Sequence, residues 1–387
     1  MATYYIRPDG SNSNSGTGSG TGSAWATIGK ALATGSTVVG GDTVYVAPGT
    51  YREAITVGIS PSSNVNITAD PKALQFSGMT AGPVIWSGFN NATNPDDSSP
   101  TGTPCNLGTN GNWTFTDFVV HGTNTGSNGN CFNSSTSASN ITWLRCVLIA
   151  QSSSCIRCFP ANNAATLNWV IDSCVFHTNG SCFACIPTAT GGSSTIDLGI
   201  TIKNSIFYGG GNALVALAPS GTGSTFGGFT IYNCVFYAGS YGFYATPSTA
   251  LTTTYKAKIR NCLFTRQISN CILESLSNFV DEDYNRIIDT AARSVTTAGA
   301  NTKTAGILGV DAGAGLIQGF AKYHPDMPQV AGILTGDGTA TGAPTLDIFS
   351  YTRPGTPSVG AAEQNAFSSG SAGGLIVHPG MTGGMRG

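Results

Sequence analysis

A six-residue pattern of apolar and polar positions recurs six times between residues 111 and 276. The first, fifth and sixth positions are apolar, the third is polar, and the fourth is Cys, Ser or Phe. The copies begin at Phe115, Trp143, Ile171, Ile202, Ile231 and Ile259. Successive copies are separated by about 28 to 31 residues, a period typical of a solenoid in which each repeat packs on its neighbours.

The third position of each copy predicts a bend in the backbone. The first and fourth side chains can both point inward only if the chain turns between them, and Asn or Asp tolerates the left-handed conformation that this requires. Asn204, Asn233 and Asn261 hold this position in the last three copies. We expect their amides to form a ladder, with each rung advancing by about 4.8 Å.

A helical spacing of apolar residues precedes the repeats. Trp25, Ile28, Ala31 and Leu32 would lie on one face of a helix over roughly residues 24–34, with Ser23 available as the N-cap. Short strands over 4–6 and 43–47 flank this segment. An amphipathic helix here would cover the open end of a stack of strands.

Three segments carry a family resemblance. They are Tyr-Tyr-Ile-Arg-Pro-Asp-Gly-Ser at residues 4–11, Trp-Ala-Thr-Ile-Gly-Lys-Ala-Leu at 25–32, and Gly-Asp-Thr-Val-Tyr-Val-Ala-Pro-Gly-Thr-Tyr-Arg-Glu at 41–53. Together they resemble the N-terminal cap and first rung of the pectate-lyase-like right-handed parallel β-helix proteins. That superfamily includes lyases, glycosidases, epimerases, surface proteins and phage tail proteins, so the resemblance implies a fold and not an activity.

The predicted fold is therefore all-β, a right-handed parallel β-helix with an N-terminal cap helix and an irregular C-terminal region. We divide the chain into a cap and first rung over 1–57, β-helix rungs over 58–276, irregular C-terminal rungs over 277–363 and a Gly/Ser-rich tail over 364–387. Within the third part, residues 353–363 resemble the closing rung of many β-helix proteins.

The composition restricts the function. Only 9% of residues are charged, the net charge is −2 and no basic block is present, which argues against nucleic-acid binding. No apolar run approaches the roughly 18 residues needed to span a membrane. The first residues show no apolar signal segment, and we expect a protein of a virion or an extracellular surface without a signal peptide in this chain.

The eleven cysteines predict buried free thiols. Most lie inside the repeats, where other copies carry Ser, Phe or Ala, and this substitution pattern is that of small core residues. Two CxxC units, Cys155/Cys158 and Cys182/Cys185, leave zinc binding or a disulfide as the alternative. Their spacing is close to one rung, so stacking in the core is the preferred interpretation, and we expect no metal.

Acidic side chains are the candidates for catalysis. Asp117, Arg145 and Asp172 would form a charge cluster, with the two carboxylates roughly 10 Å apart by the rung spacing. The alternative interpretation is a surface ion network of little energetic value. We expect no cofactor, and Ca²⁺ only if the chain is a polysaccharide lyase, since the lyases of the resembled superfamily bind Ca²⁺ through acidic residues.

Two outward-facing columns follow from the alternation of side chains. One contains His121, His177, Tyr208 and Tyr237, an aromatic stripe that would bind sugar rings or simply stack between rungs. The other contains Val119, Val147, Val175, Ile206, Val235 and Leu263. An exposed apolar stripe is rarely left in contact with water, so we expect either residues 277–387 or another subunit to cover it.

These features favour a non-catalytic structural or adhesive protein, namely a virion component such as a phage tail or capsid appendage that binds glycan. Its expected partners are further copies of itself, as in a homotrimer, other virion proteins, or a polysaccharide. The alternative is a polysaccharide lyase or glycoside hydrolase acting on an acidic or neutral polysaccharide.

Overall fold

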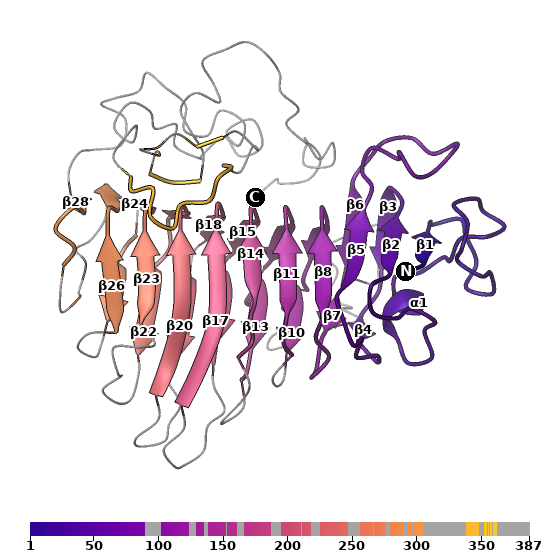
Figure 1. Cartoon of the computed structure of the whole chain (residues 1–387), viewed down its shortest axis with the longest axis horizontal. Helices are drawn as coiled ribbons and strands as arrows, with labels where there is room; N and C mark the ends of the chain where they lie inside the picture. Colours follow the sequence, from indigo (N-terminus) through magenta and orange to yellow (C-terminus); the bar gives the residue numbers. More distant parts are fainter. Residues whose placement is uncertain are drawn as a thin grey trace, which may run out of the picture.

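A computed structural model gives the arrangement of the chain (Figure 1). The residues that it describes are 1–89, 102–123, 129–134, 138–151, 153–160, 166–186, 195–209, 211–217, 225–246, 256–265, 267–274, 279–288, 293, 295, 298–304, 338–347, 352–353, 355, 357 and 359–361. In this part of the chain, no helix is long and apolar enough to cross a membrane.

Three parallel sheets form the body of the protein. The first sheet has the strand order β1 (Thr3–Ile6), β2 (Thr43–Val46), β5 (Val65–Ala69), β8 (Trp113–Thr116), β11 (Ile141–Leu144), β14 (Val170–Asp172), β17 (Thr195–Lys203), β20 (Thr225–Tyr232), β23 (Ala257–Arg260) and β26 (Val280–Asp283). The second sheet has the order β3 (Gly49–Arg52), β6 (Val84–Ser87), β9 (Val119–His121), β12 (Val147–Ala150), β15 (Val175–Thr178), β18 (Ile206–Gly209), β21 (Val235–Tyr237), β24 (Leu263–Thr265), β27 (Arg286–Ile288) and β28 (Lys303–Thr304).

The third sheet is shorter and completes each turn of the chain. Its order is β4 (Ile55–Thr56), β7 (Cys105–Asn106), β10 (Phe132–Ser134), β13 (Ile156–Cys158), β16 (Phe183–Cys185), β19 (Asn212–Leu217), β22 (Tyr241–Thr246) and β25 (Asn270–Glu274). The chain visits the first, second and third sheets in turn and then returns to the first, one strand further along. This order is the right-handed parallel β-helix predicted from the repeats, and the fold prediction is confirmed.

The predicted bend lies between the first and second sheets. The third residue of every copy has a positive φ, between 51° and 63°, at Asp117, Arg145, Ser173, Asn204, Asn233 and Asn261. This single left-handed residue turns the chain, so that the first and fourth side chains of each copy point into the core. The amide ladder is only partly formed, because Asn261 Nδ2 donates to Asn233 Oδ1 at 3.3 Å whereas Asn204 Nδ2 donates to the carbonyl of Leu346 at 2.9 Å.

A second asparagine ladder stands where the chain enters the first sheet. Asn140 Nδ2 donates to Asn112 Oδ1 at 2.8 Å, and Asn168 Nδ2 donates to Asn140 Oδ1 at 3.2 Å. All three residues have positive φ, and Gly199 and Gly228 continue the left-handed column in the next two rungs. We did not predict this ladder, although an Asn directly before an apolar strand recurs at the repeat period.

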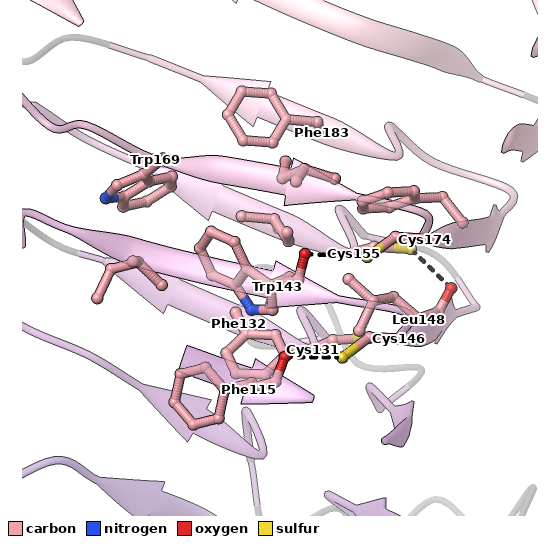
Figure 2. Close-up of a cluster of buried hydrophobic side chains, with 14 of the residues drawn as sticks. Phe115, Cys131, Phe132, Trp143, Cys146, Leu148, Cys155, Trp169, Cys174 and Phe183 are labelled. Atoms are coloured by element: carbon pink, nitrogen blue, oxygen red, sulfur yellow. Dashed lines mark hydrogen bonds between the residues drawn. The ribbon is translucent and has the colours of Figure 1, made fainter. Parts of the chain in front are cut away.

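The interior is a continuous apolar column. Phe176, Phe207, Phe236 and Phe264, from the sixth position of the repeat, stack with ring centroids 4.7, 5.0 and 4.7 Å apart. In earlier rungs the tryptophans of the first sheet meet phenylalanines of the third, and cysteine thiols fill the remaining space (Figure 2). Burial of this column supplies the main driving force for stacking the rungs.

The N-terminal cap differs from the prediction. Helix α1 is a single turn, Gly29–Leu32, and the cap helix expected over 24–34 is not formed. Trp25 instead forms a parallel β-bridge with Ile6, so the backbone at Trp25 is extended and not helical. Glu53 accepts hydrogen bonds from the amides of Ile28 and Gly29, both at 2.8 Å, and this carboxylate takes the role expected of Ser23. The apolar residues of the segment are buried all the same.

A C-terminal segment lies outside the three sheets. We call its described residues, 338–347, 352–353, 355, 357 and 359–361, the strap (yellow in Figure 1). Leu346 and Thr352 form an antiparallel bridge within it, and none of these residues pairs with a strand of the three sheets. The strap runs back beside the turns that follow β17 and β23, as its hydrogen bonds to Asn204 and Asn261 show.

Candidate functional surface

The predicted charge cluster separates into two ion pairs, one on the turn between the first and second sheets and one at the ends of β14 and β17. Arg145 donates from Nε and Nη2 to the two carboxylate oxygens of Asp117, each at 2.7 Å. This hydrogen-bonded pairing raises the pKa of Arg145. Asp172 pairs instead with Lys203, whose Nζ lies 3.1 Å from Oδ2. Each carboxylate therefore has its own cation.

Most of the other described acids also have an identified structural partner. Asp42 accepts from the amides of Ala2 and Val39, Glu53 from Ile28 and Gly29, Asp70 from Gln75, Asp197 from Gly199, and Glu274 from Phe279. Asp9 pairs with Arg7 and Asp281 with Arg260, while Asp283 accepts from Asn301. Asp347 is buried in the strap and also has a partner. Carboxylates with these partners hold turns and ends of strands in place.

Glu282 closes the C-terminal end of the core. Its side chain is fully buried and occupies the inward column that Ile259 and Ile231 fill in the preceding rungs. The carboxylate pairs with Arg293 and accepts hydrogen bonds from Asn285 Nδ2 at 2.9 Å and from Thr302 Oγ1 at 2.5 Å. Each oxygen of the Glu282 carboxylate has a donor, so the buried charge is satisfied. The side chain therefore has a structural role in closing the end of the core, and we call this ion pair and its hydrogen bonds the plug.

The two CxxC units lie in the core. Cys155, Cys158, Cys182 and Cys185 are fully buried and unoxidised, and Cys158 is the register neighbour of Cys185. Burial raises the pKa of the Cys155, Cys182 and Cys185 thiols, which keeps them protonated at neutral pH. Protonated thiols are poor metal ligands. Among the described residues, no group of three or more His, Cys, Asp or Glu side chains is arranged to hold a metal ion.

The predicted aromatic column lies on the outer face of the second sheet, in register from strand to strand. The Tyr208 and Tyr237 rings stack with centroids 5.2 Å apart and planes 10° apart, and His177 lies 4.9 Å from Tyr208. These rings therefore cover one another's faces, which are the surfaces that a sugar would need. Tyr237 is also only 4% exposed, whereas His121, His177 and Tyr208 are half-buried.

The apolar stripe is divided between two environments. Ile206, Val235 and Leu263 are at most 2% exposed and belong to one cluster with Val359 and Ala361 of the strap. The strap therefore covers this half of the stripe. In the N-terminal half, Val119 and Val147 are buried and Val175 is half-buried. The hydrophobic contact of the strap buries the faces of three successive rungs.

The asparagines of the bend anchor the strap. Asn261 Nδ2 donates to the carbonyl of Thr339 at 2.7 Å, and the Thr339 amide donates to Asn261 Oδ1 at 2.8 Å. Asn204 makes the bond to Leu346 described above and accepts one from Arg353 Nη2 at 2.9 Å. The same nitrogen of Arg353 donates to the carbonyls of Gly360 and Ala361. The bend residues thus serve as docking groups as well as turn formers.

The outer face of the first sheet carries a column of hydroxyls. Thr114, Thr142, Thr201 and Thr230 are in register, with Val170 interrupting the column. All are half-buried, as side chains in the middle of a sheet face are. Thr114 Oγ1 donates to Asn64 Oδ1 at 3.0 Å, whereas the Thr142, Thr201 and Thr230 hydroxyls have no hydrogen bond to another described residue. The column continues in register to Lys258 and Asp281, so the uncharged row of hydroxyls ends at a charged pair of residues.

Comparisons with known proteins agree at the level of the fold. No family model and no curated protein matches the sequence. Among solved structures, the pectate lyase Pel9A aligns with 94% of this chain and 97% of its own, at 14% identity and a TM-score of 0.39. A rhamnogalacturonan lyase aligns with 78% of this chain and 88% of its own, at 15% identity and a TM-score of 0.41.

A phage protein is also similar. The tailspike protein gp49 of Acinetobacter baumannii bacteriophage Fri1, a capsular polysaccharide depolymerase, aligns with 76% of this chain and 61% of its own, at 12% identity and a TM-score of 0.39. Likeness this distant carries no inference about activity. The strand order described above defines this chain as a protein of the pectate-lyase-like parallel β-helix fold.

Proposed function

We propose that this chain is a non-catalytic structural or adhesive β-helix protein that assembles with further copies of itself, as in a homotrimer. The observation that carries the proposal is the pairing of acids: every acidic side chain in the described part of the chain has a structural partner. Polysaccharide hydrolysis needs two carboxylates free to transfer protons or attack, and Asp117 and Asp172 are each engaged by a cation.

The setting that we propose is a virion, as a phage tail or capsid appendage. Two properties support it. The body is one column of parallel rungs, and only 9% of the residues of the chain are charged, so the polar groups of the protein are mainly hydroxyls and amides. Other virion proteins are then partners in addition to further copies of the chain.

The adhesive part of the proposal concerns a glycan. The threonine column of the first sheet supports it better than the aromatic column, because among the described residues three of its four hydroxyls have no hydrogen bond, whereas the tyrosine ring faces are already covered. Thr142, Thr201 and Thr230 would exchange hydrogen bonds with sugar hydroxyls. Replacement of all three by Val, which has the same shape, should remove binding to an immobilised polysaccharide panel, whereas replacement by Ser should preserve it.

The alternative is a polysaccharide lyase or glycoside hydrolase, and one assay separates it from the proposal. The wild-type protein is incubated with acidic and neutral polysaccharides, with and without Ca²⁺, and new reducing ends are measured. We expect none. Release of reducing ends that is lost in Asp117→Asn or Asp172→Asn would establish the enzyme and contradict the proposal.

A further inference from the structure

The strap is attached to the body by side chains and not by strand pairing. Its described polar contacts with the body include the bonds to Asn204 and Asn261 and one backbone bond, from the Gly360 amide to the Asn261 carbonyl at 2.7 Å. Its apolar contact is made by Val359 and Ala361 on the stripe. A segment held in this way can detach without opening any of the three sheets.

Arg353 concentrates the attachment at one point. Its side chain is buried, and Nη2 alone joins Asn204 Oδ1 to the carbonyls of Gly360 and Ala361. This guanidinium therefore holds the apolar end of the strap against the bend of the β17 rung. Loss of these Arg353 hydrogen bonds would release Val359 and Ala361, which cover the stripe.

The connection between the body and the strap is long enough for a strap to bind either its own copy or a neighbouring copy. Residues 305–337 join β28 to the strap, and a chain of this length can reach on the order of 100 Å when extended. A neighbouring copy presents the same asparagines and the same stripe. Exchange of an identical element between copies preserves every contact and is a low-cost route to an oligomer.

We propose that, in the assembled protein, the strap of one copy binds the asparagines and apolar stripe of a second copy. The proposal rests on the self-association in the proposed function, and it identifies strap binding as the contact that joins the copies. At low concentration a strap binds its own body, because the connection gives it a high effective concentration there. In a crowded assembly, exchange links the copies, and the stripe is covered both before and after the exchange.

The experiment uses the full chain with Tyr232 replaced by the photoreactive p-benzoylphenylalanine. The Tyr232 ring lies directly beside Gly342 of the strap, since a Cβ at that glycine would be 2.5 Å from a ring carbon. Light and heavy-nitrogen copies are unfolded together, refolded, concentrated and irradiated, and the cross-linked peptides are identified by mass. The same pairing is probed from the strap by placing the photoreactive residue at Leu346, whose side chain is 45% exposed.

Exchange predicts that about half of the cross-links in the concentrated sample join a light to a heavy peptide, and that Arg353→Ala reduces cross-linking at both positions. The mass of each sample in solution is measured in parallel. An assembled mass with cross-links only between peptides of equal label would overturn exchange and leave the proposed assembly standing. A monomeric mass in the concentrated sample would overturn both.

Discussion

Arg353 donates a hydrogen bond of 2.9 Å to Asn204 Oδ1 across 149 residues of sequence. The bond joins a left-handed bend residue of the β-helix to a segment that belongs to none of its sheets. Asn204 thereby serves two purposes, because the residue that turns the chain also donates from its amide to the strap that covers it. The C-terminal region is tied to the middle of the solenoid through this contact.

Arg353→Ala should loosen the strap without unfolding the body. The substitution removes a charge-assisted bond to Asn204 and leaves the carbonyls of Gly360 and Ala361 with one donor fewer, a loss of about 2 kcal/mol in strap attachment, or roughly 30-fold in its opening equilibrium. Hydrogen exchange of the Gly338, Thr339 and Gly360 amides of the strap, which donate hydrogen bonds, should accelerate by this factor, while exchange of β11 and β14 stays unchanged. Equal acceleration in both regions would show that the strap and body unfold together.

Substitutions at Ser173 test directly whether the bend residue of each rung needs the left-handed conformation. Its φ is 57°, a conformation that Asn tolerates and a β-branched residue does not. Ser173→Val should destabilise the protein by about 1–2 kcal/mol, whereas Ser173→Asn should be neutral or stabilise it by a few tenths. Urea denaturation of the three proteins measures the difference. A Val variant as stable as the wild type would contradict the bend geometry.

The lowered pKa of His121 predicts that the stability of the protein depends on pH. Burial, assisted by the charge of Arg52, lowers the pKa of His121 to about 4 from the ordinary value of 6.5. The unfolded chain therefore takes up this proton first as the pH falls, and the free energy of unfolding should decrease between pH 6.5 and 4. Burial raises the pKa of Glu53, which contributes with the opposite sign, so the measurement must be a difference.

The comparison is the slope of unfolding free energy against pH in the wild type and in His121→Gln. The variant should have the flatter slope between pH 6.5 and 4. Arg52→Gln serves as a partial control, because it removes only the smaller cause of the shift. Parallel curves for the wild type and His121→Gln would show that His121 titrates at its ordinary pKa.

Substitution of Arg293 and Glu282 tests whether their ion pair stabilises the C-terminal end of the core. Arg293→Ala leaves a buried carboxylate without its cation and should cost about 3 kcal/mol of stability. Addition of Glu282→Gln neutralises the stranded charge, so the double variant should be more stable than Arg293→Ala alone. Thermal unfolding of the four combinations measures this coupling. Additive effects of the two substitutions would mean that the ion pair contributes nothing to the closing rung.

The repeat period predicted the fold, because each rung depends on local residues that recur in sequence. Where tertiary partners decide the structure, prediction failed: Trp25 bridges Ile6 and Glu53 binds the amides of Ile28 and Gly29, so only one helical turn forms in the cap. Local pattern also could not pair Asp172 with Lys203 or bring Arg353 to Asn204, since these contacts depend on the register between rungs and on a long return of the chain.

The central claim is that the chain is an assembling scaffold and not a polysaccharide-cleaving enzyme. Light scattering across a range of protein concentrations tests it most directly when the same samples are assayed on polysaccharides. We predict a mass that rises with concentration to a fixed multiple of the 39.5 kDa chain, with no new reducing ends. A mass that stays at 39.5 kDa in a sample that cleaves a polysaccharide would contradict the account.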